Sequence, residues 1–544
     1  MAEKHKIRKD EVSLGRRDIL VYAVGRAEHA SAAAERLRDD YPGSRIFLAV
    51  DGDAVTPVSA DAVISKKGLG GTLKKLGLSR PDVFALVVSN EPRYLSPGAL
   101  LRAVWYSFAL RPGRRESFLY AWSGRYFLKD KAGEVFKKAL GLAVRPFYLA
   151  LLKASHLACE IVFPLLNGKP RKRPYDAVCV KGVLVLSLDL IGDMVWAGPA
   201  VSSIKKRSPG TRVDLLAANR NTGLAGFIEG VDRVIGYDAP WLKKVHYPAG
   251  GAWPGFSRWR NLKTRLSLLL AGYDLVVDLR GDAGDTVLAY FTGAPYRAGG
   301  AVRSTGSVQA GDVSYLLTHN VPQYMSSGDG AHVVERSMAL MGALGFGGEV
   351  APGWLKPDAS CETEVRRLLA EFGIKEGELV IGLQPGASRP EKRWDIDGFA
   401  VVAKTLMERH GARVVVAGSR DEMPLGEYIT GKAPGAVNLC GRTSLGGFIA
   451  LVNACGLFIT NETSAISIAS AVGTPLVCMM TGRPDLYGPY GVRSAVLQKR
   501  PDCWSPVIEH CFCPYEYRCL RDISPDEVLA AAEELLAPTA SGAS

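Results

Sequence analysis

The chain contains 544 residues, of which 47% are hydrophobic and 22% are charged. This composition provides for several hydrophobic cores and about three or four domains, which excludes a wholly disordered chain. The 59 glycines follow no three-residue period, so a collagen-like structure is excluded. No apolar run reaches about 18 residues without a charge, and residues 1–18 lack the apolar core of a secretory signal. Ten cysteines do not make a secreted disulfide scaffold, so a reducing cytoplasm is expected.

Positive charge is concentrated in the first third of the chain. Residues 1–175 hold 31 Lys and Arg against 17 Asp and Glu, whereas the remainder holds 36 against 38. This asymmetry predicts a boundary near residue 175. The basic segment is either a solvated surface or a binding surface for an anionic partner, such as a membrane or a nucleic acid. No aromatic–basic binding pattern accompanies it, so a nucleic-acid partner is not expected.

Residues 1–135 are predicted to form a smaller, degenerate α/β unit. The segment 18–50 parallels the segment 182–217 once three residues are gapped, and each runs strand, helix, proline–glycine turn, strand. The strand in 81–90 would match the one in 273–281. Chance resemblance between two βαβ units is the alternative explanation.

Residues 136–176 are predicted to form an amphipathic helix and a basic linker. In PFYLALLKASHLACEIVF (146–163), the polar side chains of Lys153, His156 and Glu160 fall within about 60° of each other, and the rest of the circumference is apolar. Such a helix packs against protein or lies in a membrane interface. The linker GKPRKR (168–173) could bind anionic headgroups, which favours contact with a membrane.

The rest of the chain alternates between strand and helix patterns, which predicts doubly wound parallel sheets. We assign residues 177–355 and 356–544 to two Rossmann-like domains that face a cleft, the second ending in a helix. Ligands in such folds bind outside the carboxyl ends of the strands. Apolar runs typical of buried parallel strands are VLVLSL, VDLLA, YDLVVDL, ELVIGL, ARVVVA, LFIT and PLVCMM, in chain order.

The segment SLDLIGD (187–193) brings a carboxylate to the turn between a strand and a helix. Asp193 would face the cleft there, and Gly192 would allow a ligand to approach the backbone closely. A carboxylate in this place can act as a general base toward a sugar hydroxyl, or it can simply cap the helix. The spacing alone leaves both roles open.

Two further loops are candidates for binding an anion. QPGASRPEKRW (384–394) follows a strand, and its backbone N–H groups with Lys392 and Arg393 are suited to a phosphate or diphosphate. In TNETSA (460–465), Thr463 and Ser464 can cap a helix whose N-terminus can meet an anion. A solvated basic turn and simple helix capping are the respective alternatives.

These pieces occur in an order that resembles the lipopolysaccharide heptosyltransferases of glycosyltransferase family 9, over residues 182–535. The resemblance also rests on VDRVIGYD, VNLCGRTSLGGFIALVNACGLFITNETSAISIASAVGTPLV, GPYG and the tail RCLRDISPDEVLAAAEELL. It covers about two-thirds of the chain and excludes the first 175 residues. It implies a GT-B-type, inverting, metal-independent enzyme with the acceptor on the first Rossmann-like domain and the nucleotide sugar on the second.

The resemblance also implies roles for individual residues. Asp193 matches the family's acidic residue and is the proposed general base, with Gly192 on the acceptor side. Lys392 matches the basic residue on the donor diphosphate. The other positions implied to bind the donor are Gln384, Gly386, Ser388, Arg393, Leu439, Gly441, Thr443, Ser444, Glu462, Thr463 and Ser464.

The chain departs from the family at 461–467, where the usual pattern is close to N-D-S-G-x-x-H. Glu462 stands for Asp, Ser464 for Gly and Ser467 for His. These changes alter the expected donor contacts. They leave open a changed sugar, a changed acceptor or lost activity.

A late group of cysteines could hold a structural zinc ion, but its spacing lacks the paired C-x-x-C knuckles of zinc sites, so free thiols are favoured. No cofactor is expected to be required. The group consists of Cys503, Cys511, Cys513 and Cys519.

The leading hypothesis is transfer of a heptose or similar sugar from a nucleotide sugar, for which the resemblance implies ADP-heptose, to a lipopolysaccharide core or lipid-linked acceptor. The expected place is the cytoplasm, peripheral to the inner face of the inner membrane. The alternative is a catalytically silent family member that acts as a binding or scaffold protein in surface-polysaccharide assembly.

Overall fold

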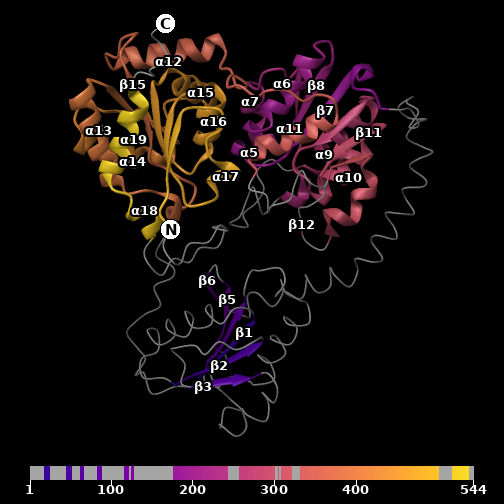
Figure 1. Ribbon diagram of the computed structural model, residues 1–544, viewed down its shortest axis with the longest axis horizontal. Helices are drawn as coiled ribbons and strands as arrows, with labels where there is room; N and C mark the ends of the chain where they lie inside the picture. Colours follow the sequence, from indigo (N-terminus) through magenta and orange to yellow (C-terminus); the bar gives the residue numbers. More distant parts are fainter. Residues whose placement is uncertain are drawn as a thin grey trace. The chain divides into compact units, whose positions relative to one another are not determined.

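The computed structural model describes residues 175–242, 257–300, 308–321, 331–500 and 517–537, together with the backbone of short strands in 18–127 and at 304–305. By contacts the chain divides into two compact units (Figure 1). One consists of Met1–Pro146 with Val507–Phe512, and the other of Phe147–Pro506 with Cys513–Ser544. The predicted helix at 146–163 and the basic linker at 168–173 lie outside the described residues.

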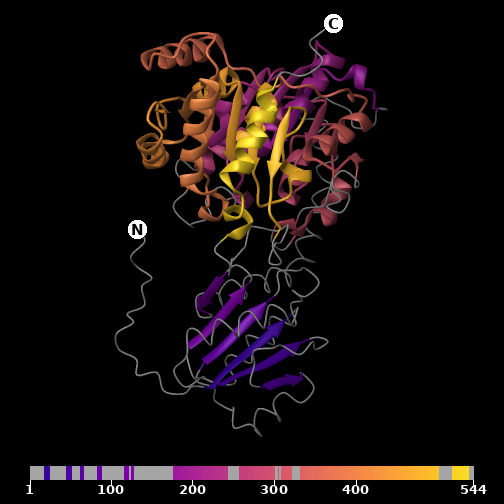
Figure 2. The same ribbon diagram turned by 60° about the vertical axis from the view of Figure 1, so that its left-hand side comes forward.

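The N-terminal sheet has six strands in the order β3-β2-β1-β4-β5-β6 (Figure 2). All neighbours pair in parallel except β5 and β6, which are antiparallel. Parallel neighbours require crossover connections, as expected for an α/β unit. The strands are β1 (Asp18–Val24), β2 (Arg45–Asp51), β3 (Ala62–Ser65), β4 (Val83–Val88), β5 (Glu116–Ala121) and β6 (Gly124–Phe127).

The middle sheet also has six strands, and all of them are parallel, in the order β14-β11-β10-β7-β8-β9. Its strands are β7 (Gly182–Ser187), β8 (Arg212–Ala217), β9 (Arg233–Gly236), β10 (Leu275–Asp278), β11 (Tyr296–Gly299) and β14 (His319–Asn320), and a short hairpin joins β12 (Ser304–Thr305) to β13 (Val308–Gln309). The helices are α5 (Ile191–Val195), α6 (Gly198–Arg207), α7 (Thr222–Ala225), α9 (Arg258–Leu270), α10 (Ala283–Phe291) and α11 (Val333–Ala343).

The C-terminal sheet repeats this arrangement with six parallel strands in the order β17-β16-β15-β18-β19-β20. Its strands are β15 (Val380–Gln384), β16 (Arg413–Val416), β17 (Val437–Asn438), β18 (Leu457–Asn461), β19 (Leu476–Met479) and β20 (Ser494–Leu497). The helices are α12 (Ala359–Glu371), α13 (Ile396–His410), α14 (Met423–Lys432), α15 (Leu445–Ala454), α16 (Ser464–Val472), α17 (Pro484–Tyr487), α18 (Arg518–Arg521) and α19 (Pro525–Leu536).

All three sheets therefore share one strand order, although the last strand of the N-terminal sheet runs antiparallel. Counted from the first strand of each sheet, the spatial order is 3-2-1-4-5-6, the order of a dinucleotide-binding Rossmann sheet. The two parallel sheets predicted for 177–544 are confirmed. In the N-terminal sheet, β1, β2 and β4 occupy the places that β7, β8 and β10 occupy in the middle sheet. This correspondence matches the predicted alignment of residues 18–50 with residues 182–217. The boundaries of the four predicted domains remain a prediction.

Alternating side chains of β7 separate two hydrophobic cores. Leu184 and Leu186 join a core with residues of α9 and α10 on one face of the middle sheet. Val183 and Val185 point into a second core, which continues through α5, α6, α7 and α11 to the C-terminal sheet. Burial on both faces is what a continuous apolar strand predicts.

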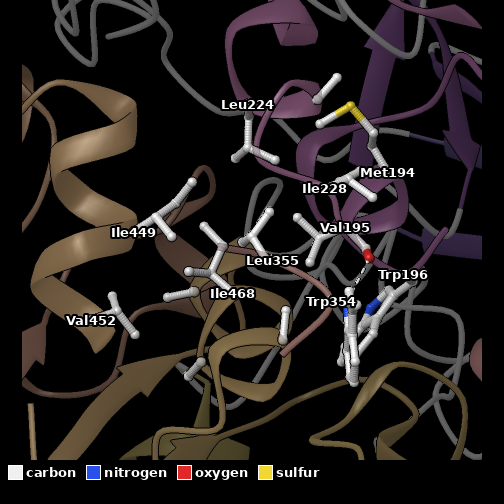
Figure 3. Packing of buried hydrophobic residues seen from close by; sticks show 14 of the residues in the cluster. Met194, Val195, Trp196, Leu224, Ile228, Trp354, Leu355, Ile449, Val452 and Ile468 are labelled. Atoms are coloured by element: carbon white, nitrogen blue, oxygen red, sulfur yellow. Dashed lines mark hydrogen bonds between the residues drawn. The ribbon is translucent and has the colours of Figure 1, made fainter. Parts of the chain in front are cut away.

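The second core connects the middle and C-terminal sheets. Figure 3 shows Met194 and Val195 of α5 packed with Trp354 and Leu355 of the connecting segment, and Ile468 of α16 close by. The indole nitrogen Nε1 of Trp354 donates to the carbonyl oxygen of Val195 at 3.1 Å. The two sheets consequently form one compact body rather than two separately packed domains. Within the described residues, no helix is both long enough and apolar enough to cross a membrane.

Candidate active site between the middle and C-terminal sheets

Asp193 lies in the first turn of α5, immediately beyond the carboxyl end of β7. The N-cap of this helix is Leu190, which forms no side-chain capping hydrogen bond. Asp193 is therefore not the N-cap residue of α5 but the third residue of the helix. Its half-buried side chain lines a pocket whose wall also includes Arg280, Arg336 and Tyr487.

Gly192 of α5 faces the first turns of α16 at ordinary van der Waals contact distance. A Cβ atom on Gly192 would lie 3.5 Å from the hydroxyl of Ser467 and 3.7 Å from Cα of Ser464. The first turn of α5, with Asp193, is thus placed beside the first turn of α16. A carboxylate at the edge of one sheet is in this way brought next to the positive end of a helix dipole on the other.

Arg280 faces the same pocket and is held by three aspartates. Its Nη1 pairs with Asp189, and its Nε lies 3.4 Å from Asp282 and 3.7 Å from Asp285. Arg280 is only 7% exposed, so these contacts determine its position. The aspartates follow β7 and β10, whose carboxyl ends are adjacent in the sheet.

A fourth carboxylate, Asp278, completes this buried cluster at the end of β10. It accepts hydrogen bonds from the N–H groups of Arg280 and Gly281 and from the hydroxyl of Thr286. Burial raises the pKa of Asp278 to about 6 despite these donors. Burial and the neighbouring Asp278 also raise the pKa of Asp285, whose carboxylate accepts from the indole of Trp241.

The loop after β15 is fastened to the end of β18. Asn461 accepts a hydrogen bond from the N–H of Trp394 at 2.9 Å and donates to the carbonyl of Pro385 at 2.8 Å. The Gln384 side chain accepts from the hydroxyl of Thr463 at 2.9 Å. The two candidate anion-binding loops, predicted separately from the sequence, are therefore one structure at the carboxyl edge of the C-terminal sheet.

Lys392 forms an ion pair with Glu462 across this edge. The Lys392 Nζ lies 2.6 Å from Oε1 of Glu462. The other oxygen of Glu462 accepts from the N–H and hydroxyl of Thr481 and from the N–H of Gly482, at 2.7–3.0 Å. Burial alone would raise the pKa of Glu462, but Lys392 and these donors outweigh it, and the pKa lies below its usual value.

Most of the remaining side chains predicted to bind the donor are already hydrogen-bonded within the protein or buried. Arg393 donates both of its described hydrogen bonds to the carbonyl of Ala387, within its own loop. Thr463 caps α16 through its hydroxyl, as the capping alternative predicted for it, whereas Ser464 is the first residue of that helix. Ser444 caps α15, which was not predicted. Leu439 is fully buried, so only its backbone could meet a ligand.

Three further predicted donor positions lie in the loops that follow β15 and β17. Ser388 is exposed, Thr443 is half-buried, and Gly441 has a φ of 70°. A Cβ on Gly441 would lie 2.8 Å from the backbone of Arg420, so a side chain does not fit there.

Glu422 is a candidate that the sequence analysis missed. It follows β16, the neighbour of β15, and a Cβ on Gly386 would lie 1.7 Å from its Oε1. An acidic residue after the second strand of a Rossmann sheet is where a ribose hydroxyl is bound. The signal in the sequence was the SRDE segment directly after the strand ARVVVAG.

Arg280 and Arg336 were also missed. The YDLVVDLRGD segment was recognised only as a strand with a polar end, and Arg336 lies within α11, far from any motif. Cys503, Cys511 and Cys513 lie outside the described residues, whereas Cys519 is a half-buried residue of α18. Among the residues with described positions, no group of side chains could hold a metal ion.

Two Rossmann-like sheets, with Asp193 at the carboxyl end of one and the Lys392 loop at the carboxyl end of the other, are the arrangement of a GT-B-type glycosyltransferase fold. The family model for glycosyltransferase family 9 (heptosyltransferase) matches residues 261–508. The chain is similar to the lipopolysaccharide heptosyltransferases of that family, and this similarity supports a glycosyltransferase activity.

Individual relatives agree with this assignment. The chain is 26% identical to a lipooligosaccharide heptosyltransferase 2 of Haemophilus influenzae over 56% of this chain and 83% of the relative. It is 25% identical to lipopolysaccharide heptosyltransferase 2 of Escherichia coli over 65% of this chain and 98% of the relative. A family 9 glycosyl transferase from Veillonella parvula has the same fold, with a TM-score of 0.54, 20% identity and coverage of 66% and 99%. These comparisons give no support to the silent scaffold alternative.

Proposed function

We propose that the enzyme transfers a heptose, with inversion, from a nucleotide sugar to a lipopolysaccharide core or related lipid-linked acceptor. The observation that carries the proposal is the contact of Gly192 with the first turn of α16. It brings Asp193 next to the start of α16, which Thr463 caps. The names of the relatives support heptose as the sugar.

The reaction proposed for this cleft is a single displacement. The acceptor hydroxyl attacks the anomeric carbon of the donor sugar while the bond from that carbon to the diphosphate oxygen breaks. Asp193, as the ionised general base, takes the hydroxyl proton. The nucleoside diphosphate leaves with the electron pair of the broken bond, and the new glycosidic bond has the opposite anomeric configuration.

Stabilisation of the departing diphosphate is assigned to the C-terminal sheet. The ammonium group of Lys392 and the positive end of the α16 dipole would supply the positive field there. Glu422 is suited to accept hydrogen bonds from the ribose hydroxyls. Neither contribution requires a metal ion in this mechanism.

The finer parts of the proposal concern the donor base and the place of action. We propose ADP as the nucleotide, because family 9 heptosyltransferases, which this sequence resembles, imply ADP-heptose. We also propose that the enzyme works at the cytoplasmic face of the inner membrane, where a lipid-linked acceptor would be presented. A structural zinc ion at the late cysteines remains a weak and separate prediction.

The donor is tested by thermal unfolding of the purified protein with ADP, GDP, UDP, CDP, dTDP and ADP-heptose. A ligand at about 100 times its dissociation constant stabilises the folded state by about 2.7 kcal/mol, which is a readily measured shift. We expect selective stabilisation by ADP and ADP-heptose, lost in Lys392→Ala. Selectivity for another nucleotide would replace the donor, and no response to any nucleotide would contradict the proposal.

The general base is tested with Asp193→Asn. We expect turnover with ADP-heptose and a core acceptor to fall by at least about 100-fold, because general base catalysis contributes 10²–10⁴-fold. Stabilisation by ADP should remain, since Asp193 does not bind the nucleotide. Asp526→Asn, an exposed aspartate on α19, is the matched control and should keep full turnover. Undiminished turnover in Asp193→Asn would exclude the role.

A further inference from the structure

Helix α9 presents an unusual apolar stripe to solvent. Its exposed apolar side chains are Trp259 (74% exposed), Leu262 (45%), Leu266 (51%) and Leu270 (68%). At about 100° per residue they fall within an arc of about 80° along the whole helix. Scattered exposed leucines are ordinary on a protein surface, but a continuous stripe of this kind marks a binding surface.

The charges on α9 all have one sign. The helix, RWRNLKTRLSLLL, contains four Arg and Lys residues and no Asp or Glu. Lys263 lies about 55° from the centre of the stripe on one side, and Arg260 lies further round on that same side. Arg265 flanks the opposite side of the stripe. The exposed surface of the helix is therefore apolar in the middle, with Lys263 as the exposed cation beside the stripe, because Arg260 lies 4.0 Å from the carboxylate of Asp238 and Arg265 is bonded to Tyr237.

The opposite face of α9 holds the helix on the protein. Asn261 and Leu268 are buried, and the Asn261 amide donates to the carbonyl of Asp238 at 2.7 Å. Arg265 donates from Nε to the hydroxyl of Tyr237 at 2.7 Å. Ser257 caps the helix by accepting from the N–H of Arg260. The buried face of α9 thus holds the helix on the protein, and the apolar stripe faces the solvent.

We propose that α9 is a membrane-docking helix, which binds the surface of a bilayer that contains anionic phospholipids. The leucines and Trp259 would enter the headgroup region, and Lys263 would pair with lipid phosphates. A protein partner fits less well, because a stable interface needs about 20–30 residues a side. A stripe of four side chains on a helix of about 20 Å is too small for that.

The position of α9 suits an enzyme whose acceptor is anchored in lipid, and to this extent the inference rests on the proposed function. Crossover helices run antiparallel to the strands of a parallel sheet, so the first turn of α9 lies at the carboxyl edge of the middle sheet. Its contact with Asp238, two residues beyond β9, agrees with this direction. Asp193 lies at the same edge. A membrane on α9 would therefore be close to the proposed acceptor entrance.

The test is co-sedimentation of the full chain with vesicles of phosphatidylethanolamine and phosphatidylglycerol, compared with phosphatidylcholine alone. We expect binding to the anionic vesicles that weakens with added salt. The variant Trp259→Ser/Leu262→Ser/Leu266→Ser should bind at least about tenfold more weakly. Lys263→Glu should weaken binding about 30-fold, which corresponds to two unit charges at about 1 kcal/mol each.

Matched controls come from α13, which also carries an exposed apolar and an exposed cationic side chain. Val401→Ser and Lys404→Glu should bind vesicles like the wild type, since the two positions are comparably exposed on the other sheet. Vesicles with brominated acyl chains should quench a part of the tryptophan fluorescence that is absent in Trp259→Phe. This second measurement reports contact with lipid directly and does not depend on turnover.

Three outcomes would overturn the proposal. Equal vesicle binding by the wild type and the α9 variants would show that the stripe is covered or that another segment binds the membrane. A wild type that sediments as a dimer, with a monomeric triple variant, would make a second copy the occupant. No vesicle binding by any form would remove the membrane location, while the nucleotide and turnover tests of the transferase would stand unaffected.

Discussion

Glu462 stands where the family pattern has Asp, and the structure accommodates the longer side chain at the carboxyl edge of the C-terminal sheet. The sequence analysis expected the longer side chain to disturb the phosphate contacts. In the structure, three donors hold one carboxylate oxygen and Lys392 pairs with the other. Glu462 is therefore a positioning residue that fixes the ammonium group near the start of α16.

The Lys392–Glu462 pair is expected to show strong coupling. Lys392→Met leaves a buried carboxylate without its cation, and Glu462→Gln leaves the ammonium without its anion, so each single change should destabilise. In the double variant neither charge remains. Urea unfolding of the four proteins should give a coupling energy of about 1–3 kcal/mol. Additive effects would show that the pair contributes nothing beyond its separate groups.

At the scale of a single element, helix α11 begins with a histidine cap that joins the two sheets. His332 accepts from the N–H of Val334 through Nδ1, and its Nε2 lies 3.0 Å from the carbonyl oxygen of Gly488. Its ring also stacks on Tyr490 and meets the edge of Trp196. One neutral tautomer, with the proton on Nε2, satisfies both ring nitrogens. A second proton on Nδ1 would break the cap.

This cap predicts a definite pH dependence. Burial lowers the pKa of His332 from 6.5 to about 4. The unfolded chain therefore takes up a proton in that interval while the folded chain does not, so stability falls as the pH drops from about 6.5 to 4. The loss is at most about 3 kcal/mol at the acidic end.

His332→Asn keeps a capping side chain but cannot titrate. The stability advantage of the wild type over this variant should be largest above pH 6.5 and should shrink toward pH 4. Thermal unfolding of both proteins across this range measures the difference. A difference that does not change with pH would mean that His332 is not the titrating group.

At the scale of the whole molecule, the connection between the sheets is built into a shared core. Trp354 lies against Gly198, where an added Cβ would be 2.2 Å from its Cδ1. The same indole donates to the carbonyl oxygen of Val195, two residues after Asp193 in α5. The packing that joins the two sheets thus also supports the short helix that carries the proposed base.

Gly198→Ala should therefore push helix α6 away from the indole ring of Trp354. We expect a loss of about 1–3 kcal/mol in unfolding free energy, because an extra methyl group in a packed core forces its neighbours apart. Gly223→Ala in α7 is the matched control, since nothing lies within 4 Å of its added Cβ. That change should be neutral or slightly stabilising. Equal stabilities of the two variants would contradict the tight contact with Trp354.

The fold was largely predictable from local patterns. Apolar runs such as VLVLSL predicted strands that are buried on both faces, and Thr463 was recognised as a cap before the residues of α16. Asp193 was placed correctly at the turn after β7, because a strand followed by Leu-Ile-Gly-Asp leaves little choice. Arg280 was not recognised, because the three aspartates that surround it come from two strands that are neighbours only in the sheet.

What the sequence determined by itself is the order of the elements, since the period of apolar residues and the position of glycines and caps depend only on nearby residues. Only the tertiary structure decided which side chains meet. It paired Lys392 with Glu462 across 70 positions and placed Gly192 against α16. It also left the leucine stripe of α9 uncovered, because periodicity predicts an amphipathic helix and packing alone determines which of its faces is buried.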